Sequence, residues 1–219
     1  MQVEIWSDVV CPWCYVGKRR FESALARFAH GAEVEVVWRS FELDPEAPRR
    51  RPGTAAEHLA RKYGLSAEQV TASWERLTEL AADEGLEYHL ERTAGGNSFA
   101  AHRLIHLGAA HGLQDAVKER LLRAYFTDGE AIGEPEALQR LGVESGLDAD
   151  EVAELLAGDR FAADVREDER RARLLGINGV PFFAIDGRYG VSGAQPAELL
   201  LSALEQAWAD RAAVEVAAG

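Results

Sequence analysis

Two short strands with a helix between them are predicted at the start of the chain. Residues 3–7 alternate weakly between apolar and polar side chains, which is typical of a strand, and residues 34–38 are rich in β-branched side chains. Residues 12–29 repeat apolar side chains at helical spacing, and Pro12 suits the first turn of a helix. The pattern therefore predicts the order strand, helix, strand.

The middle of the chain is predicted to be entirely helical. Residues 41–53 include three prolines and form an irregular boundary. From residue 54 to residue 176 apolar positions recur at helical spacing, and Ser66 and Gln69 have the spacing of a capping box. This block therefore reads as a series of helices without strands.

Strand signals return near the end of the chain. Residues 182–185 and 188–191 flank Asp186-Gly187, a strong signal for a two-residue hairpin, and Pro196 opens a final helix. The strands at the two ends of the chain are expected to form one mixed sheet, so the fold class is α/β. The expected parts are a core of residues 1–53 and 177–213 and a helical insertion of residues 54–176.

Composition narrows the function classes. The net charge is −13, from 37 acidic and 24 basic residues, which argues against a nucleic-acid partner. No apolar run approaches the roughly 20 residues of a membrane span. The first residues lack the basic start of a signal peptide and carry acidic residues within their one apolar stretch, so the expected location is the cytoplasm.

The two cysteines of the chain are the strongest chemical signal. They form the segment Cys11-Pro12-Trp13-Cys14, where the first strand ends and the first helix begins. The N-terminus of a helix favours an anion, so we expect the pKa of the Cys11 thiol to be lowered. Cytoplasmic thiols are mostly reduced, which favours a catalytic or metal-binding pair over a permanent disulfide. The segment therefore predicts a redox dithiol.

The order of elements and this dithiol resemble the thioredoxin fold with the helical insertion of DsbA-like proteins, and most closely the FrnE-like branch of the DsbA family. Val180-Pro181, directly before the third strand, matches the cis-proline that faces the redox pair. Kappa-class glutathione transferases and 2-hydroxychromene-2-carboxylate isomerases share the architecture but typically have serine where Cys11 stands. The segments that carry the resemblance are residues 7–14, 40–48, 97–104, 176–183 and 192–195.

The resemblance implies a role for each residue of the site. Cys11 is the expected nucleophile and Cys14 the resolving thiol. Pro12 and Trp13 flank the reactive sulfur, and Trp13 replaces the histidine typical of periplasmic DsbA oxidases, so a less oxidising couple is expected. The residues expected to form the substrate groove are Val180 and Pro181, with Gly193 and Gln195 as a neighbouring edge.

Two further groups of side chains carry weaker signals. Glu42 and Asp44 are candidates for proton transfer to Cys14, although a solvated loop is the simpler interpretation. His102 and His106 lie four residues apart and, with the two cysteines, have the composition of a Cys₂His₂ zinc set. The proline before the third strand weighs against a metal, so no metal site is predicted.

Three functions remain open from the sequence. The leading hypothesis is a cytoplasmic thiol–disulfide oxidoreductase or isomerase that acts on protein or small-molecule thiols. It needs no bound cofactor beyond the Cys11–Cys14 disulfide, with glutathione as a candidate co-substrate. The second is a glutathione-dependent isomerase or polyketide-tailoring enzyme, and the third is a zinc-stabilised binding module. Neither a nucleic acid nor a membrane is an expected partner, and a homodimer is compatible with the resemblance.

Overall fold

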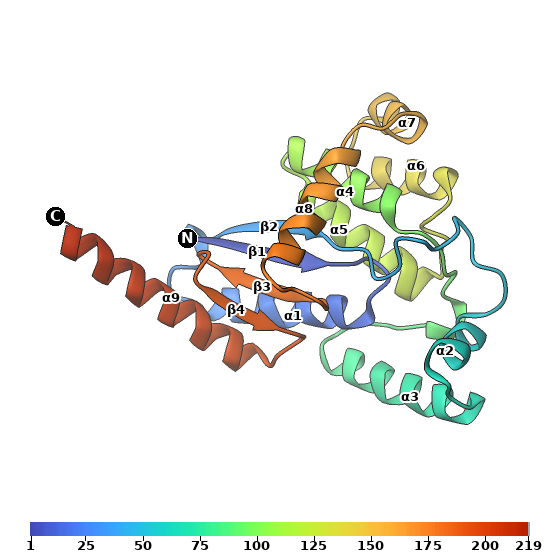
Figure 1. The fold of residues 1–219 in the computed structure, drawn as a ribbon, viewed down its shortest axis with the longest axis horizontal. Coiled ribbons are helices and arrows are strands. Elements are labelled where there is room, and N and C mark those ends of the chain that lie inside the picture. Colours follow the sequence, from blue (N-terminus) through green and yellow to red (C-terminus); the bar gives the residue numbers. More distant parts are fainter. Residues whose placement is uncertain (219) are drawn as a thin grey trace. The chain divides into compact units, whose positions relative to one another are not determined.

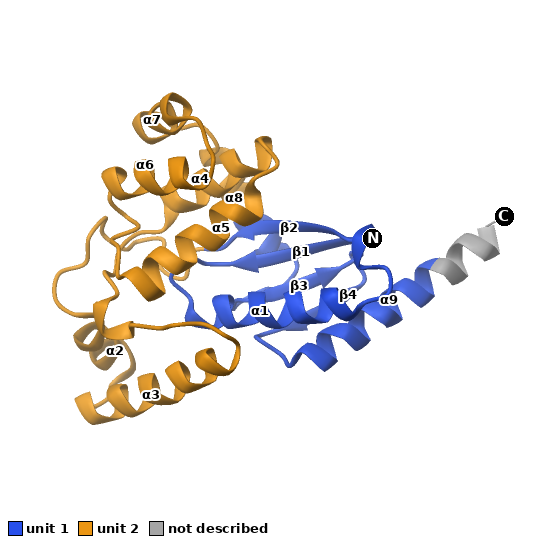
Figure 2. Cartoon of the chain, turned by 180° about the vertical axis from the view of Figure 1, so that it is seen from behind, with its two compact units in different colours: residues 1–41, 168–219 blue, residues 42–167 orange. Residues whose placement is uncertain are grey.

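The computed structural model describes residues 1–218, with side chains to residue 211. The chain divides into two compact units (Figure 2). The first contains Met1–Phe41 and Asp168–Gly219, and the second contains Glu42–Glu167. Within the described residues no helix is both long enough and apolar enough to cross a bilayer.

Four strands of the first unit form a mixed sheet in the order β2-β1-β3-β4 (Figure 1). The central strand β1, Gln2–Ser7, runs parallel to β2, Glu35–Ser40, and antiparallel to β3, Phe182–Ile185. The hairpin partner of β3 is β4, Tyr189–Ser192. The sheet thus joins the two ends of the sequence, as the strand pattern predicted.

The two faces of this sheet bury different side chains. Ile5 and Phe183 are paired on neighbouring strands, and the Phe183 ring stacks on Phe21 of α1, Pro12–Arg27, with a centroid distance of 5.5 Å. On the opposite face Trp6 packs with Ala172. Successive side chains of β1 therefore contribute to two apolar layers, one on each face, as expected for a sheet with helices on both faces.

Helices complete the first unit. The last helix, α9, spans Ala197–Ala218 and packs against α1 (Figure 1). Helix α8 spans Ala162–Leu174, and its residue Asp168 is hydrogen-bonded to the sheet: Trp6 Nε1 donates to the Asp168 carbonyl at 2.9 Å. The backbone N–H of Ser40 donates to the Asp168 carboxylate, also at 2.9 Å. These bonds place residue 168 onward in the first unit, whereas the sequence placed the boundary at residue 176.

The second unit is built from helices, as predicted. Capping boxes at Thr54 with Glu57 and at Ser66 with Gln69 start its first two helices. Two details of this part of the chain do not follow from the helical spacing: residues 124–128 form a π-helical turn, and Leu175 after α8 is 58% exposed. The elements of this unit, besides the start of α8, are α2 Ala55–Tyr63, α3 Ala67–Asp83, η2 Leu90–Arg92, α4 Phe99–Ala110, α5 Gln114–Arg123, η3 Ala124–Asp128, α6 Pro135–Glu144 and α7 Ala149–Ala157.

Candidate functional site

The two cysteines lie where the turn after β1 enters α1. Cys11 is the N-cap residue of the helix, in an extended conformation, and Pro12 occupies the first helical turn. The Cys14 N–H donates to the Cys11 carbonyl at 3.0 Å. Cys11 retains 4% of its surface exposed and Cys14 none. Both cysteines are therefore buried, and Cys11 is the more exposed of the two.

A second segment brings a backbone carbonyl to the reactive sulfur. The peptide bond between Val180 and Pro181 is cis. The Cys11 Sγ donates to the Val180 carbonyl at 3.6 Å. The loop before β3 and the start of α1, which are 169 residues apart in sequence, thus meet at one point. The sequence named both partners, and the fold of the first unit places them together.

The turn between β4 and α9 lies beside Pro181. The Gly193 N–H donates to the Pro181 carbonyl at 2.8 Å, and Gly193 has a φ of +81°, which favours glycine. The Gln195 side-chain amide donates to the Ser192 carbonyl at 2.8 Å and so closes its own turn. Gly193 and Gln195 therefore shape this edge of the site, and direct substrate contacts by them stay a prediction.

Trp13 supplies an exposed apolar surface beside the cysteines. Its side chain is 44% exposed, although it sits between two buried residues of the same segment. A large aromatic side chain in water gains free energy when a partner covers it. The arrangement therefore offers an apolar contact next to the reactive sulfur.

The Cys11 thiol is held in its neutral form. The hydrogen bond between the Cys11 and Cys14 side chains raises the pKa of Cys11 well above its ordinary value, and burial raises it further. The Cys14 N–H acts in the opposite direction, and the charge of Asp8 adds to the increase. The expectation of a lowered pKa was wrong in direction, because burial and the neighbouring side chains outweigh the helix terminus.

Asp8 is a residue of the site that the sequence interpretation did not single out. It is fully buried, its carbonyl accepts from the Cys11 N–H at 3.3 Å, and its Oδ1 accepts from the Val10 N–H at 3.4 Å. A carboxylate in an apolar segment three residues before the first cysteine was the available signal. The carboxylate is thereby placed close enough to act on the charge of Cys11.

The weaker candidates occupy different environments. Glu42 is not in a solvated loop: its buried carboxylate pairs with Arg166 and accepts from Asn97 Nδ2 at 3.3 Å. Asp44 pairs with Arg51. Among the side chains that the structure describes, those of residues 1–211, no three His, Cys, Asp or Glu gather as a metal site would require.

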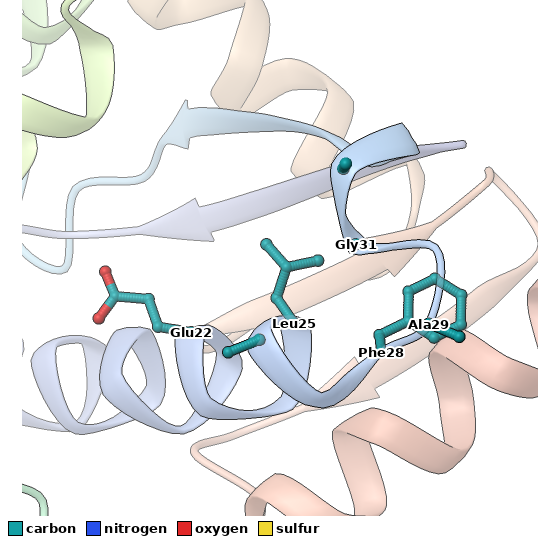
Figure 3. A pocket seen from close by; sticks show the side chains of 7 residues that line it. Glu22, Leu25, Phe28, Ala29 and Gly31 are labelled. Atoms are coloured by element: carbon teal, nitrogen blue, oxygen red, sulfur yellow. The ribbon is translucent and has the colours of Figure 1, made fainter.

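A shallow pocket of about 520 Å³ lies at the far end of α1 (Figure 3). It lies beside the last turns of this helix and the turn that follows it. Leu25 is 14 residues beyond Cys11, which at 1.5 Å per helical residue is about 20 Å. The pocket is therefore separate from the dithiol. Its lining residues are Glu22, Leu25, Ala26, Phe28, Ala29, Gly31 and Ala32.

Comparison with known proteins identifies the family of the chain. Residues 2–205 match the model of the DSBA-like thioredoxin domain, so the chain belongs to this family. It is an enzyme of the DsbA-like oxidoreductase type. A crystal structure of a probable DsbA oxidoreductase from Streptomyces coelicolor is 49% identical, with a TM-score of 0.92 over 95% of this chain and 90% of that chain.

More distant structures share the fold. A 2-hydroxychromene-2-carboxylate isomerase has 19% identity and a TM-score of 0.71, over 98% of this chain and 99% of that chain. The cytosolic disulfide reductase DsbM from Pseudomonas aeruginosa has 20% identity and a TM-score of 0.62, over 94% and 98%. DsbM has also been solved with glutathione. At these identities the similarity establishes the thioredoxin fold with its helical insertion.

Proposed function

We propose that the protein exchanges disulfides with thiol substrates through Cys11 and Cys14. The observation that carries the proposal is the contact between the Cys11 sulfur and the Val180 carbonyl, at 3.6 Å, beside an exposed Trp13. A reactive sulfur, a backbone edge and an apolar flank meet there. These are the elements needed to hold an extended chain next to a disulfide.

The reaction in the reducing direction has two steps. Cys11 loses its proton to solvent, and its thiolate attacks one sulfur of the substrate disulfide; the other substrate sulfur leaves as a thiolate and takes up a proton. Cys14 then loses its proton and attacks the Cys11 sulfur of the mixed disulfide, and the second substrate sulfur leaves as a thiolate and takes up a proton. The substrate gains two electrons and two protons, and the enzyme is left with a Cys11–Cys14 disulfide. Two molecules of a thiol such as glutathione restore the dithiol and form glutathione disulfide.

The environment of Cys11 favours reduction or isomerisation over oxidation. A raised pKa of the Cys11 thiol makes its thiolate a poorer leaving group, so the enzyme disulfide is a weaker oxidant. Trp13 adds no positive charge that would stabilise the thiolate. The couple is therefore expected to be less oxidising than that of a periplasmic DsbA oxidase.

The remaining parts of the proposal concern partners. The substrate is a protein or small-molecule thiol or disulfide, glutathione is the co-substrate, and no cofactor is bound. The cytoplasm is the proposed location; the fold is shared with a cytosolic disulfide reductase. A homodimer is the proposed assembly.

A second candidate is glutathione-dependent isomerisation of an aromatic or polyketide-like molecule. The shared fold with a 2-hydroxychromene-2-carboxylate isomerase supports it. The presence of both cysteines favours disulfide exchange, because isomerisation has no use for a resolving thiol.

Replacement of Cys14 tests the proposal. The C14S variant is expected to lose steady-state disulfide reduction and to accumulate a mixed disulfide at Cys11, visible by mass spectrometry. The C11S variant is the matched control and should form none. Turnover of a disulfide substrate by C14S at the rate of the unchanged enzyme, without a trapped adduct, would contradict the dithiol mechanism.

A further inference from the structure

Gly17 lies one helical turn after Cys14 and faces Pro181. A Cβ atom added at Gly17 would stand 2.8 Å from Pro181 Cγ and 3.5 Å from both Pro181 Cβ and Ala194 Cβ. A separation of 2.8 Å is shorter than van der Waals contact between carbons allows. Any side chain at position 17 therefore forces Pro181 or α1 to move.

The neighbours of Gly17 are held in place and cannot simply yield. The closest atom is Cγ of the Pro181 ring, which can move only by a change of ring pucker, while the fixed φ of proline restrains the backbone that carries the ring. The Pro181 carbonyl accepts from the Gly193 N–H at 2.8 Å. The Ala194 carbonyl accepts from Arg20 Nη1, also on α1, at 2.6 Å. The turn around residue 194 is thus fixed between α1 and Pro181.

The same helix carries the cysteines, so this packing sets the width of the site. Pro181 directly follows Val180, whose carbonyl accepts from the Cys11 sulfur. Glycine is a poor helix former, and its presence within α1 runs against local propensity. The close approach to Pro181 accounts for it.

We infer that Gly17 is a positioning residue that sets the separation between Cys11 and the Val180 backbone, and that the resulting site selects disulfides carried by an extended peptide. This inference rests on the proposed function. A peptide that pairs with Val180 needs its backbone edge and its disulfide aligned at the same time. A small disulfide without amide groups contacts the sulfur alone and is insensitive to that alignment.

The test compares two substrates with the G17A variant. Reduced enzyme is reacted with a short extended peptide that contains a disulfide and with hydroxyethyl disulfide. The measured quantity is the second-order rate constant for the peptide divided by that for hydroxyethyl disulfide. Loss of about one net hydrogen bond to the substrate predicts a fivefold to tenfold fall in this ratio. The matched control is G179A, in the same loop as Val180, because a Cβ at Gly179 meets nothing within 4 Å.

A second pair of variants keeps the test decisive if G17A does not fold. R20Q replaces the guanidinium that donates to the Ala194 carbonyl with a shorter, neutral amide and leaves Gly17 unchanged, whereas R20K keeps a cationic donor. The ratio should fall in R20Q and recover in R20K. A ratio unchanged in both G17A and R20Q, or in R20Q alone where G17A is unfolded, overturns the inference. Failure of the unchanged enzyme to react with either disulfide would instead refute the proposed function.

Discussion

Asp8 is buried three residues before Cys11, and its carbonyl accepts the Cys11 N–H at 3.3 Å. The hydrogen bond from Cys14 and burial are the larger causes of the raised pKa of Cys11, and the negative charge of Asp8 acts in the same direction. A thiolate at Cys11 would place a second negative charge near this carboxylate. A substitution at Asp8 can therefore change the reduction potential of the Cys11–Cys14 pair without altering the sulfurs themselves.

The D8N variant should make the couple more oxidising. Removal of the negative charge lowers the pKa of the Cys11 thiol, which stabilises the reduced form through its thiolate. Because the thiolate is scarce at neutral pH, the reduction potential at pH 7 is expected to change little. At high pH, where the thiolate is populated, it should rise by up to about 30 mV, a tenfold change in the exchange equilibrium. Equilibration with glutathione buffers of known ratio measures it.

The control for D8N is D186N. Asp186 lies in the β3–β4 hairpin beyond Ile185, which pairs with Val3 near the start of β1, whereas Cys11 follows the end of that strand. Its φ of +53° is tolerated by asparagine. The potential of D186N should equal that of the unchanged protein. An equal potential in D8N at high pH would show that the carboxylate does not act on the dithiol.

Alkylation of the reduced protein should depend steeply on pH. Because the pKa of Cys11 is raised, chiefly by the Cys14 hydrogen bond and by burial, the thiolate is scarce at neutral pH. The rate with iodoacetamide is expected to be below that of free cysteine at pH 7 and still rising above pH 9. A plateau below pH 7 would indicate a lowered pKa instead.

The raised pKa of Cys11 also makes the stability of the reduced protein depend on pH. The folded state binds the thiol proton more tightly than the unfolded state, whose cysteine pKa is about 8.5. The stabilisation that comes from this bound proton is complete below the unfolded-state pKa. It is lost as the pH rises toward the higher pKa of the folded state. The reduced protein should therefore lose more stability between pH 8 and pH 10 than C11S. Urea unfolding of both proteins over this range measures the difference.

The strands could be predicted from the sequence because their signals are local. Residues 182–185 carry a continuous apolar run beside a turn dipeptide, and the structure has β3 at the same bounds. The dithiol and Pro181 were recognisable because residue type and order alone define them. The signals for helix starts such as Ser66 were equally local, since both residues of a capping box lie within four consecutive positions.

The interactions that tune the site could not be predicted, because they join segments far apart in sequence. Nothing near Gly17 reveals that Pro181 packs against it, 164 positions later. The pKa of Cys11 was misjudged because the helix terminus is visible in the sequence whereas burial is not. Leu175 is apolar, but it is 58% exposed after the end of α8.

The buried carboxylate of Glu42 should matter for stability and not for catalysis. It pairs with Arg166 and accepts from Asn97, whose own Oδ1 caps the N-terminus of α4 through the Phe99 N–H at 2.9 Å. E42Q weakens the charged bonds and is expected to cost about 1–3 kcal/mol. Urea unfolding measures the loss. A proton-transfer role predicts the reverse, with unchanged stability and slower release of the mixed disulfide by Cys14.

Trp13 should contribute to the binding of peptide substrates. Its ring is 44% exposed beside Cys11, so W13A removes apolar surface that a bound chain would cover while leaving the core intact. Covering part of one aromatic side chain is worth roughly 1–2 kcal/mol, which predicts about a tenfold rise in KM for a peptide disulfide. Reactivity toward hydroxyethyl disulfide should change little.

The matched control is W208A: Trp208 stacks on His30 at 4.2 Å near the far end of α1, so this variant should lose stability and keep its KM. Equal effects of W13A on both disulfides would mean that Trp13 acts on the thiol itself and not on the bound chain.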